Sequence, residues 1–148
     1  MMAGAAEPRG EMQANLTVEI RARLKPPCRV PGPVGLVLDR RNERIPDLVV
    51  VCGERGGAKR LTGAEAVVEI LSESTAEYEL AEKRLRHMQL PGLEEIWIVW
   101  PGHCQVQLWR KDAEDRWRGE DVTAAEAIRS GLLAEPLPLD AVYGPMGL

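Results

Sequence analysis

Two short apolar runs, each carrying one acidic residue, constrain the fold of this chain more than any other feature. The first run covers residues 46–52 (PDLVVVC) and contains Asp47, and the second covers residues 66–71 (AVVEIL) and contains Glu69. Apolar runs of about four to eight residues, rich in β-branched side chains, are typical of buried strands. A carboxylate in such a strand is costly to desolvate unless a partner compensates for it, and a divalent cation is one such partner.

Length and composition indicate an ordinary globular protein. The chain has 148 residues, of which 45% are hydrophobic and 28% are charged, enough to bury a core without disulfides or a structural metal. We predict a disordered segment at residues 1–10 and a single domain over residues 11–148. No apolar run approaches the roughly 18 residues of a membrane helix, and residues 1–10 lack the apolar core of a signal peptide. We therefore expect a cytoplasmic protein with no membrane partner.

The three cysteines, Cys28, Cys52 and Cys104, are odd in number and widely spaced. This spacing indicates neither a disulfide framework nor a zinc knuckle. Cys52 lies in an apolar run, which favours the role of a small buried hydrophobic residue.

Helical and extended patterns alternate along the chain. Apolar residues four positions apart predict an amphipathic helix over residues 11–24, and a second helix is expected over residues 74–88. The apolar stripe of the second helix is expected to pack on the sheet through Tyr78, Ala81, Leu85 and Met88. Further strands are expected at residues 34–39, 95–100 and 105–110, with a turn-like stretch at residues 40–44, a strand or turn near Trp117 and a short helix at residues 124–129. This order permits a crossover, so we predict an α/β fold with a central mixed β-sheet flanked by helices.

Asp47, Glu69 and Lys83 form the candidate site. Alternate residues of a strand share a face, so the two carboxylates converge if their strands are neighbours. Magnesium binds one or two carboxylates together with water and phosphate oxygens, so this pair is sufficient for a site. Lys83, on the predicted second helix, could orient or deprotonate the attacking water, or stabilise charge on a phosphate.

These residues resemble the Uma-two-type restriction endonucleases of the PD-(D/E)XK nuclease superfamily. The resemblance rests on Pro-Asp before an apolar run, on Val-Glu-Ile-Leu-Ser-x-Ser-Thr, on Glu79 and Lys83, and on Gly-Leu-Glu-Glu-Ile-Trp-Ile-Val. It implies a restriction-endonuclease-like fold in which Asp47 and Glu69 bind Mg²⁺ or Mn²⁺, Lys83 is catalytic and Glu79 supports the site. It also implies an endonuclease that hydrolyses phosphodiester bonds in DNA. A homodimer is expected because cutting two strands requires two sites.

The candidate residues also have purely structural explanations. Asp47 follows a proline and could begin a turn, and Glu69 could face water on an edge strand. Glu79 and Lys83 could form an i,i+4 surface pair worth about 0.2–0.5 kcal/mol. Lys83 also lies about 140–160° from the centre of the predicted apolar stripe. The isolated histidines His87 and His103 are expected at the surface or at a helix end.

Three positions depart from the pattern of the resembled family. The chain has Glu73, Glu79 and Trp100 where that family usually has proline, aspartate and aspartate. The net charge of −4 also argues against a broad nucleic-acid-binding surface. The alternative function is therefore a catalytically inactive nuclease-fold protein that acts as a nucleic-acid-binding or dimerisation module.

Overall fold

The structure is a computed structural model. It describes residues 3–31, 35–37, 43–44, 46–53, 60–61, 63–72 and 77–148. The helices are α1 (Ala3–Arg23), α2 (Glu77–Met88) and α3 (Leu139–Tyr143), followed by the 3-10 helix η1 (Gly144–Met146). The strands are β1 (Gly35–Val37), β2 (Glu43–Arg44), β3 (Leu48–Val50), β4 (Arg60–Leu61), β5 (Ala66–Ile70), β6 (Glu95–Trp100), β7 (Gln105–Lys111), β8 (Trp117–Thr123), β9 (Ala127–Ile128) and β10 (Leu137–Pro138).

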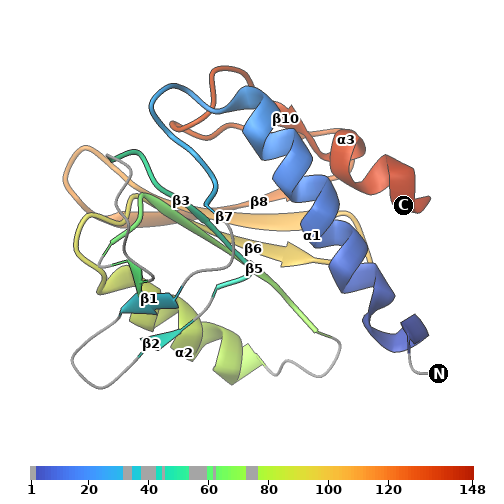
Figure 1. Cartoon of the computed structure of the whole chain (residues 1–148), viewed down its shortest axis with the longest axis horizontal. Coiled ribbons are helices and arrows are strands. Elements are labelled where there is room, and N and C mark those ends of the chain that lie inside the picture. The colour runs from blue at the N-terminus through green and yellow to red at the C-terminus, as the bar shows by residue number, and fades with distance from the viewer. Residues whose placement is uncertain are drawn as a thin grey trace.

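A five-stranded mixed sheet forms the centre of the molecule, in the order β3-β5-β6-β7-β8. β5 and β6 are parallel, and the other neighbouring strands are antiparallel. Because parallel neighbours need a crossover, the chain between them passes through α2 on one side of the sheet. Figure 1 shows α1 and α3 on the other side. The predicted mixed sheet flanked by helices is therefore confirmed.

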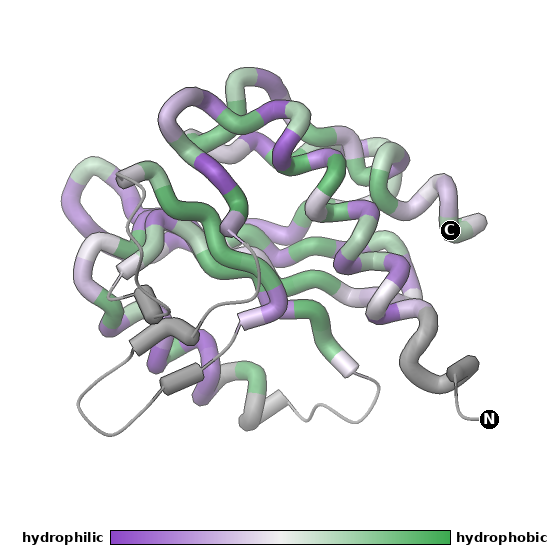
Figure 2. The backbone as a smooth tube through the Cα atoms, in the orientation of Figure 1, coloured by the Kyte–Doolittle hydropathy of each residue, from purple (hydrophilic) through white to green (hydrophobic). Residues whose placement is uncertain are grey.

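Each face of the sheet has its own apolar cluster. On one face, Met12, Leu16 and Ile20 of α1 pack with alternate strand residues such as Val68. On the other face, Leu80 and Met88 of α2 pack against a second set of strand residues that includes Val67. The hydrophobic colouring of the central strands in Figure 2 reflects this burial on both sides. Among the described residues, no helix is both long and apolar enough to cross a membrane.

Several elements differ from the predictions. α1 begins at Ala3 rather than at residue 11, so part of the segment predicted to be disordered is helical. Alanines favour the helix there, and Arg9 forms an ion pair with Asp47. Residues 43–44, predicted to be turn-like, pair with β1, and residues 127–128 form a strand instead of a helix. The predicted start of the second helix at Ser74 lies outside the described residues.

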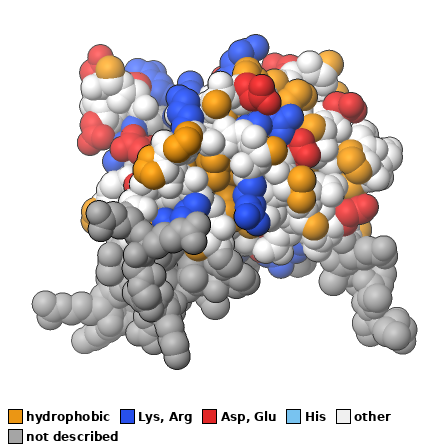
Figure 3. All heavy atoms as spheres, turned by 45° about the horizontal axis from the view of Figure 1, so that its top comes forward, with side chains coloured by type: hydrophobic (Ala, Val, Ile, Leu, Met, Phe, Trp, Pro, Cys, Tyr) orange, Lys and Arg blue, Asp and Glu red, His pale blue; other side chains and the backbone are white. Residues whose placement is uncertain are grey.

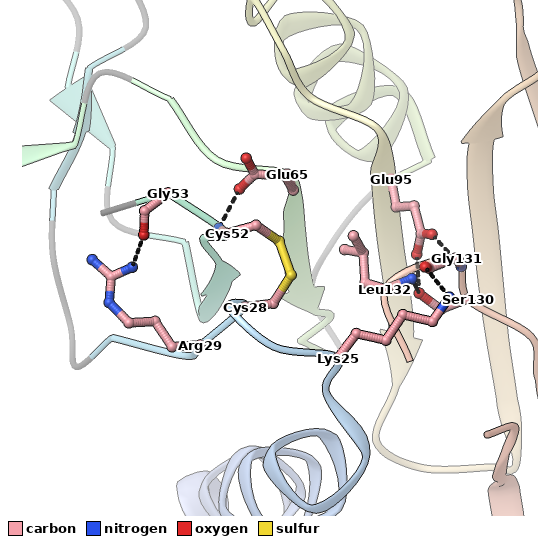
Figure 4. Close-up of a disulfide and its surroundings, with 10 residues drawn as sticks. All are labelled: Lys25, Cys28, Arg29, Cys52, Gly53, Glu65, Glu95, Ser130, Gly131 and Leu132. Atoms are coloured by element: carbon pink, nitrogen blue, oxygen red, sulfur yellow. Dashed lines mark hydrogen bonds between the residues drawn. A yellow bond between two sulfur atoms is a disulfide. The ribbon is translucent and has the colours of Figure 1, made fainter. Parts of the chain in front are cut away.

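Cys28 and Cys52 form a disulfide bond, contrary to the prediction from cysteine spacing. Arg29 and Val51 exchange backbone hydrogen bonds, which brings the segment after α1 beside the end of β3. The backbone N–H of Cys52 also donates to Glu65 Oε2 at 2.7 Å (Figure 4). The spacing of the cysteines in the sequence did not predict this disulfide, because the two cysteines are brought together by the contact between Arg29 and Val51, which are far apart along the chain. Cys104 is a free thiol.

Reduction of the disulfide is expected to lower the melting temperature. The two cysteines are 24 residues apart, and closing a loop of that length stabilises the fold by about 3 kcal/mol. For a chain of this size the loss corresponds to roughly 6–12 °C in a thermal melt with reductant. The Cys104→Ser variant should respond to reductant like the parent, whereas a Cys28→Ser/Cys52→Ser variant should not respond. An equal melting temperature of the parent with and without reductant would contradict the prediction.

A buried carboxylate attaches the C-terminal segment to the sheet. Glu95 Oε1 accepts hydrogen bonds from Trp97 Nε1 at 2.9 Å and Ser130 Oγ at 2.7 Å. Its Oε2 accepts the backbone N–H of Gly131 at 2.9 Å (Figure 4). A second attachment comes from Tyr143, whose hydroxyl lies within hydrogen-bond distance of two backbone carbonyls of the β6–β7 hairpin. Burial raises the pKa of this hydroxyl, so it stays protonated and remains a donor.

Candidate active site

The sheet register brings Asp47 and Glu69 opposite each other. β3 and β5 are antiparallel neighbours, with Leu48 paired to Val68. Asp47 directly precedes Leu48 and Glu69 directly follows Val68, so the same register continued by one residue sets the two acids opposite. β5 also lies between β3 and β6, which rules out the structural explanation of Glu69 as an edge-strand residue.

Asp47 bridges the end of the sheet and the helix α1. Its Oδ2 accepts the backbone N–H of Ile70 at 2.7 Å, and its Oδ1 forms an ion pair with Arg9 Nη2 at 2.7 Å. Gln13 of α1 donates to the Asp47 backbone carbonyl at 2.8 Å. The Asp47 side chain is 13% exposed, whereas that of Arg9 is 50% exposed. One carboxylate oxygen is therefore held by the backbone, and the other by a largely solvated side chain.

Glu69 has its partner on the opposite face of the sheet. Its Oε1 lies 3.0 Å from Nε2 of His87, in the last turn of α2. His87 is only 1% exposed, and of the two positions predicted for it, the surface or a helix end, the structure shows the helix end. The structure thus brings the two acidic positions together, while the carboxylates pair with helices on opposite faces.

The rotation of α2 about its axis differs from the prediction. Leu85, predicted to pack on the sheet, is 58% exposed. The side chains on the less exposed side follow a helical i, i+3, i+4, i+7, i+8 spacing and are Leu80, Lys83, Arg84, His87 and Met88. Arg84 determines part of this orientation, because its guanidinium lies 4.6 Å from the Trp109 ring centroid and donates to Gln107 Oε1 at 3.3 Å.

Lys83 consequently lies on the same side of α2 as His87. The two residues are one helical turn apart, about 6 Å along the axis, and His87 reaches Glu69. The apolar stripe predicted from the sequence placed Lys83 on the side of α2 that faces away from the sheet. The observed rotation of the helix differs, so this argument against a site role for Lys83 no longer holds. The side chain of Glu79, the predicted supporting residue, lies outside the described part of the structure, as does any pair it makes with Lys83.

The donor set at this position suits a hard divalent cation. Within the described residues, no group of three or more His, Cys, Asp or Glu side chains could hold a metal ion. Two carboxylates remain, Glu69 in β5 and Asp47 directly before β3. Oxygen donors of this kind are those that Mg²⁺ prefers when water and phosphate oxygens complete its shell. Asp47 Oδ1 has to leave the exposed guanidinium of Arg9 before it can bind a cation.

Sequence reasoning missed His87 as a member of this site. The available signal was its spacing of four residues from Lys83, which places both side chains on one helix face. This spacing did not predict a role for His87, because the predicted apolar stripe placed a different face of the helix against the sheet.

The family comparison assigns the chain by sequence. The model of the Uma2 family, described as "Putative restriction endonuclease", matches residues 1–139. The chain belongs to this family. A structural comparison finds a putative nuclease belonging to DUF820 from Anabaena variabilis, with a TM-score of 0.75 and 16% sequence identity. The match covers 93% of this chain and 80% of that one, and at this identity it shows a shared fold. No curated protein matches the sequence. Membership of the Uma2 family supports a nuclease function.

Proposed function

We propose that the chain is a Mg²⁺-dependent endonuclease that hydrolyses phosphodiester bonds in DNA. The observation that carries the proposal is the opposition of Asp47 and Glu69 on neighbouring strands of a nuclease-type fold. Family membership supports the nuclease class.

In this proposal Asp47 and Glu69 hold the cation, and Lys83 acts beside them. A bound divalent cation would supply charge stabilisation to the phosphate and would lower the pKa of a coordinated water. Lys83 would present its ammonium group to the phosphate, where negative charge develops in the transition state. Glu69 lies in the buried strand β5, and the backbone N–H of Ile70 holds Asp47, so little reorganisation of the backbone is needed when the substrate binds.

Cleavage assays test the proposal directly. Supercoiled plasmid DNA and a single-stranded RNA are each incubated with the protein and Mg²⁺ or Mn²⁺, and product formation is followed over time. We expect cleavage of DNA that stops with excess EDTA and resumes when Mg²⁺ is restored. The Lys83→Ala variant should cut more slowly with little change in metal affinity. Cleavage of DNA that persists in EDTA would contradict the metal dependence, and cleavage of RNA alone would contradict the substrate.

Removal of Arg9 is expected to tighten metal binding. The Arg9–Asp47 ion pair competes with a cation for Asp47 Oδ1, and a pair this exposed is worth at most about 1 kcal/mol. Arg9→Gln should therefore lower the Kd for Mn²⁺ by up to about fivefold, measured by titration calorimetry. Arg21→Gln, a change at an exposed arginine elsewhere on α1, is the matched control. Weaker Mn²⁺ binding by Arg9→Gln would show that Arg9 does not compete for this carboxylate.

An inactive nucleic-acid-binding or dimerisation module is the second candidate function. The observation that favours it is that Asp47 already has a cationic partner within the chain. On the face drawn in Figure 3, Lys and Arg side chains are interspersed with Asp and Glu rather than gathered in one field. Calorimetry with Mn²⁺ separates the two candidates, because an inert module should show no saturable binding. The homodimer stays a prediction, which sedimentation velocity can test.

A further inference from the structure

A buried histidine holds one oxygen of a candidate metal ligand. His87 Nε2 lies 3.0 Å from Glu69 Oε1, and the histidine is 1% exposed. A carboxylate that binds a cation is ionised and can only accept hydrogen bonds, so Nε2 must carry the hydrogen in this pair. The imidazole therefore holds Oε1 through a directional N–H···O hydrogen bond. Asp47 Oδ1, in contrast, is held by the guanidinium of Arg9.

Within the part of the chain that the structure describes, the only hydrogen bond of the Glu69 side chain is the one through Oε1, and Oε2 has no partner among these residues. The Glu69 side chain is 13% exposed, so a small ion can approach it. With Oε1 fixed, the carboxylate cannot rotate freely, and Oε2 keeps one direction. Orientation of this kind by an outer partner is a recurrent feature of metal sites.

The other ring nitrogen of His87 has no visible structural task. Within the described part of the chain, Nδ1 is buried and lacks a hydrogen-bond partner. A histidine that served fold stability alone would be expected to use both nitrogens, because an unsatisfied buried polar atom costs free energy. The contact with Glu69 therefore explains why a histidine occupies this position.

We infer that His87 is a positioning residue that fixes the Glu69 carboxylate for cation binding. The inference rests on the proposed function, because it assigns a role in the metal site proposed there. His87 touches neither substrate nor cation and acts through Glu69. Its removal should weaken metal binding even where the fold is retained.

Mn²⁺ calorimetry on two substitutions tests the inference at one fixed pH. His87→Leu removes the donor while keeping an apolar side chain in the buried position, and about 10–100-fold weaker Mn²⁺ binding is expected. His87→Gln retains an N–H donor at a similar reach, and its Mn²⁺ affinity should stay near that of the parent. Thermal melts in EDTA report the stability of each variant, so a loss of fold is recognised separately. A purely structural role would lower the melting temperature without changing Mn²⁺ affinity.

The chain offers a matched control in its other histidine. His103 is exposed and pairs with Gln105, so His103→Leu should leave Mn²⁺ affinity unchanged. In a Glu69→Gln background, His87→Leu should cause no further loss, because the ligand it positions is already gone. Equal Mn²⁺ affinity of parent and His87→Leu would overturn the inference while leaving the proposed function standing. If the parent itself binds no Mn²⁺ and cuts no nucleic acid, both are wrong.

A measurement on the parent avoids any effect of substitution on folding. Long-range ¹H–¹⁵N correlation of the imidazole should show a hydrogen on Nε2 of His87, with or without Mn²⁺. A hydrogen on Nδ1 and a bare Nε2 would exclude donation to Glu69 and would overturn the inference.

Discussion

Replacing Glu69 by glutamine is expected to reduce DNA cleavage about 1,000-fold or more. The change removes a hard anionic donor, and the charge stabilisation supplied through a divalent cation amounts to several kcal/mol, or tenfold in rate per 1.36 kcal/mol. Asp47→Asn should have an effect of the same order. Both replacements keep an oxygen that can accept the existing hydrogen bonds from His87 and the Ile70 backbone. The initial rate of plasmid cleavage at saturating Mg²⁺ is the measurement.

Glu82→Gln is the control for this pair of substitutions. Glu82 is an exposed acid on α2 that pairs with Arg86, so its change removes one negative charge far from the sheet face. It should leave the rate unchanged, and all three variants should melt close to the parent. Cleavage by Glu69→Gln or Asp47→Asn at the parent rate would remove that residue from the site.

Replacing Glu95 by alanine is expected to destabilise the fold by about 3–5 kcal/mol. The substitution leaves three hydrogen-bond donors, on Trp97, Ser130 and Gly131, without their acceptor. The region is buried, since Glu95 itself is 3% exposed, and unsatisfied buried donors cost free energy. It also releases the C-terminal segment from β6. The melting temperature should fall by roughly 10 °C, read from a thermal or urea melt.

The neighbouring acid provides the comparison for Glu95. Glu94 is exposed, and Glu94→Ala should change stability by no more than about 0.5 kcal/mol. Equal melting temperatures of the two variants would show that the hydrogen bonds to Glu95 contribute little to stability.

Periodicity and run length predicted the central architecture because burial on both faces leaves a continuous apolar signal. The strand containing Glu69 and the parallel neighbour after the helix follow from that signal. The rotation of α2 did not, because it depends on polar side chains of the sheet, Gln107 and Glu69, that bond Arg84 and His87. Long polar side chains such as that of Arg84 can cover apolar surface with their stems, so a stripe of apolar residues alone does not define the packed face.

The candidate site could be predicted only in part for a related reason. Asp47 and Glu69 were identifiable because a carboxylate in an apolar run is unusual. Their partners, Arg9 and His87, lie 38 and 18 residues away along the sequence, and only the tertiary fold brings them near. The Cys28–Cys52 bond was missed for the same reason, because it depends on a contact between two remote segments.

The parallel pairing of β5 with β6 has a consequence for how the site is assembled. The connection between these strands contains α2. Glu69 of β5 and Lys83 and His87 of α2 therefore belong to consecutive elements of the chain, which form one strand–helix unit. Asp47 directly precedes β3, a separate strand that pairs with β5. Small shifts at the edge of the sheet would therefore change the spacing between the two acids while leaving the glutamate, lysine and histidine in register with one another.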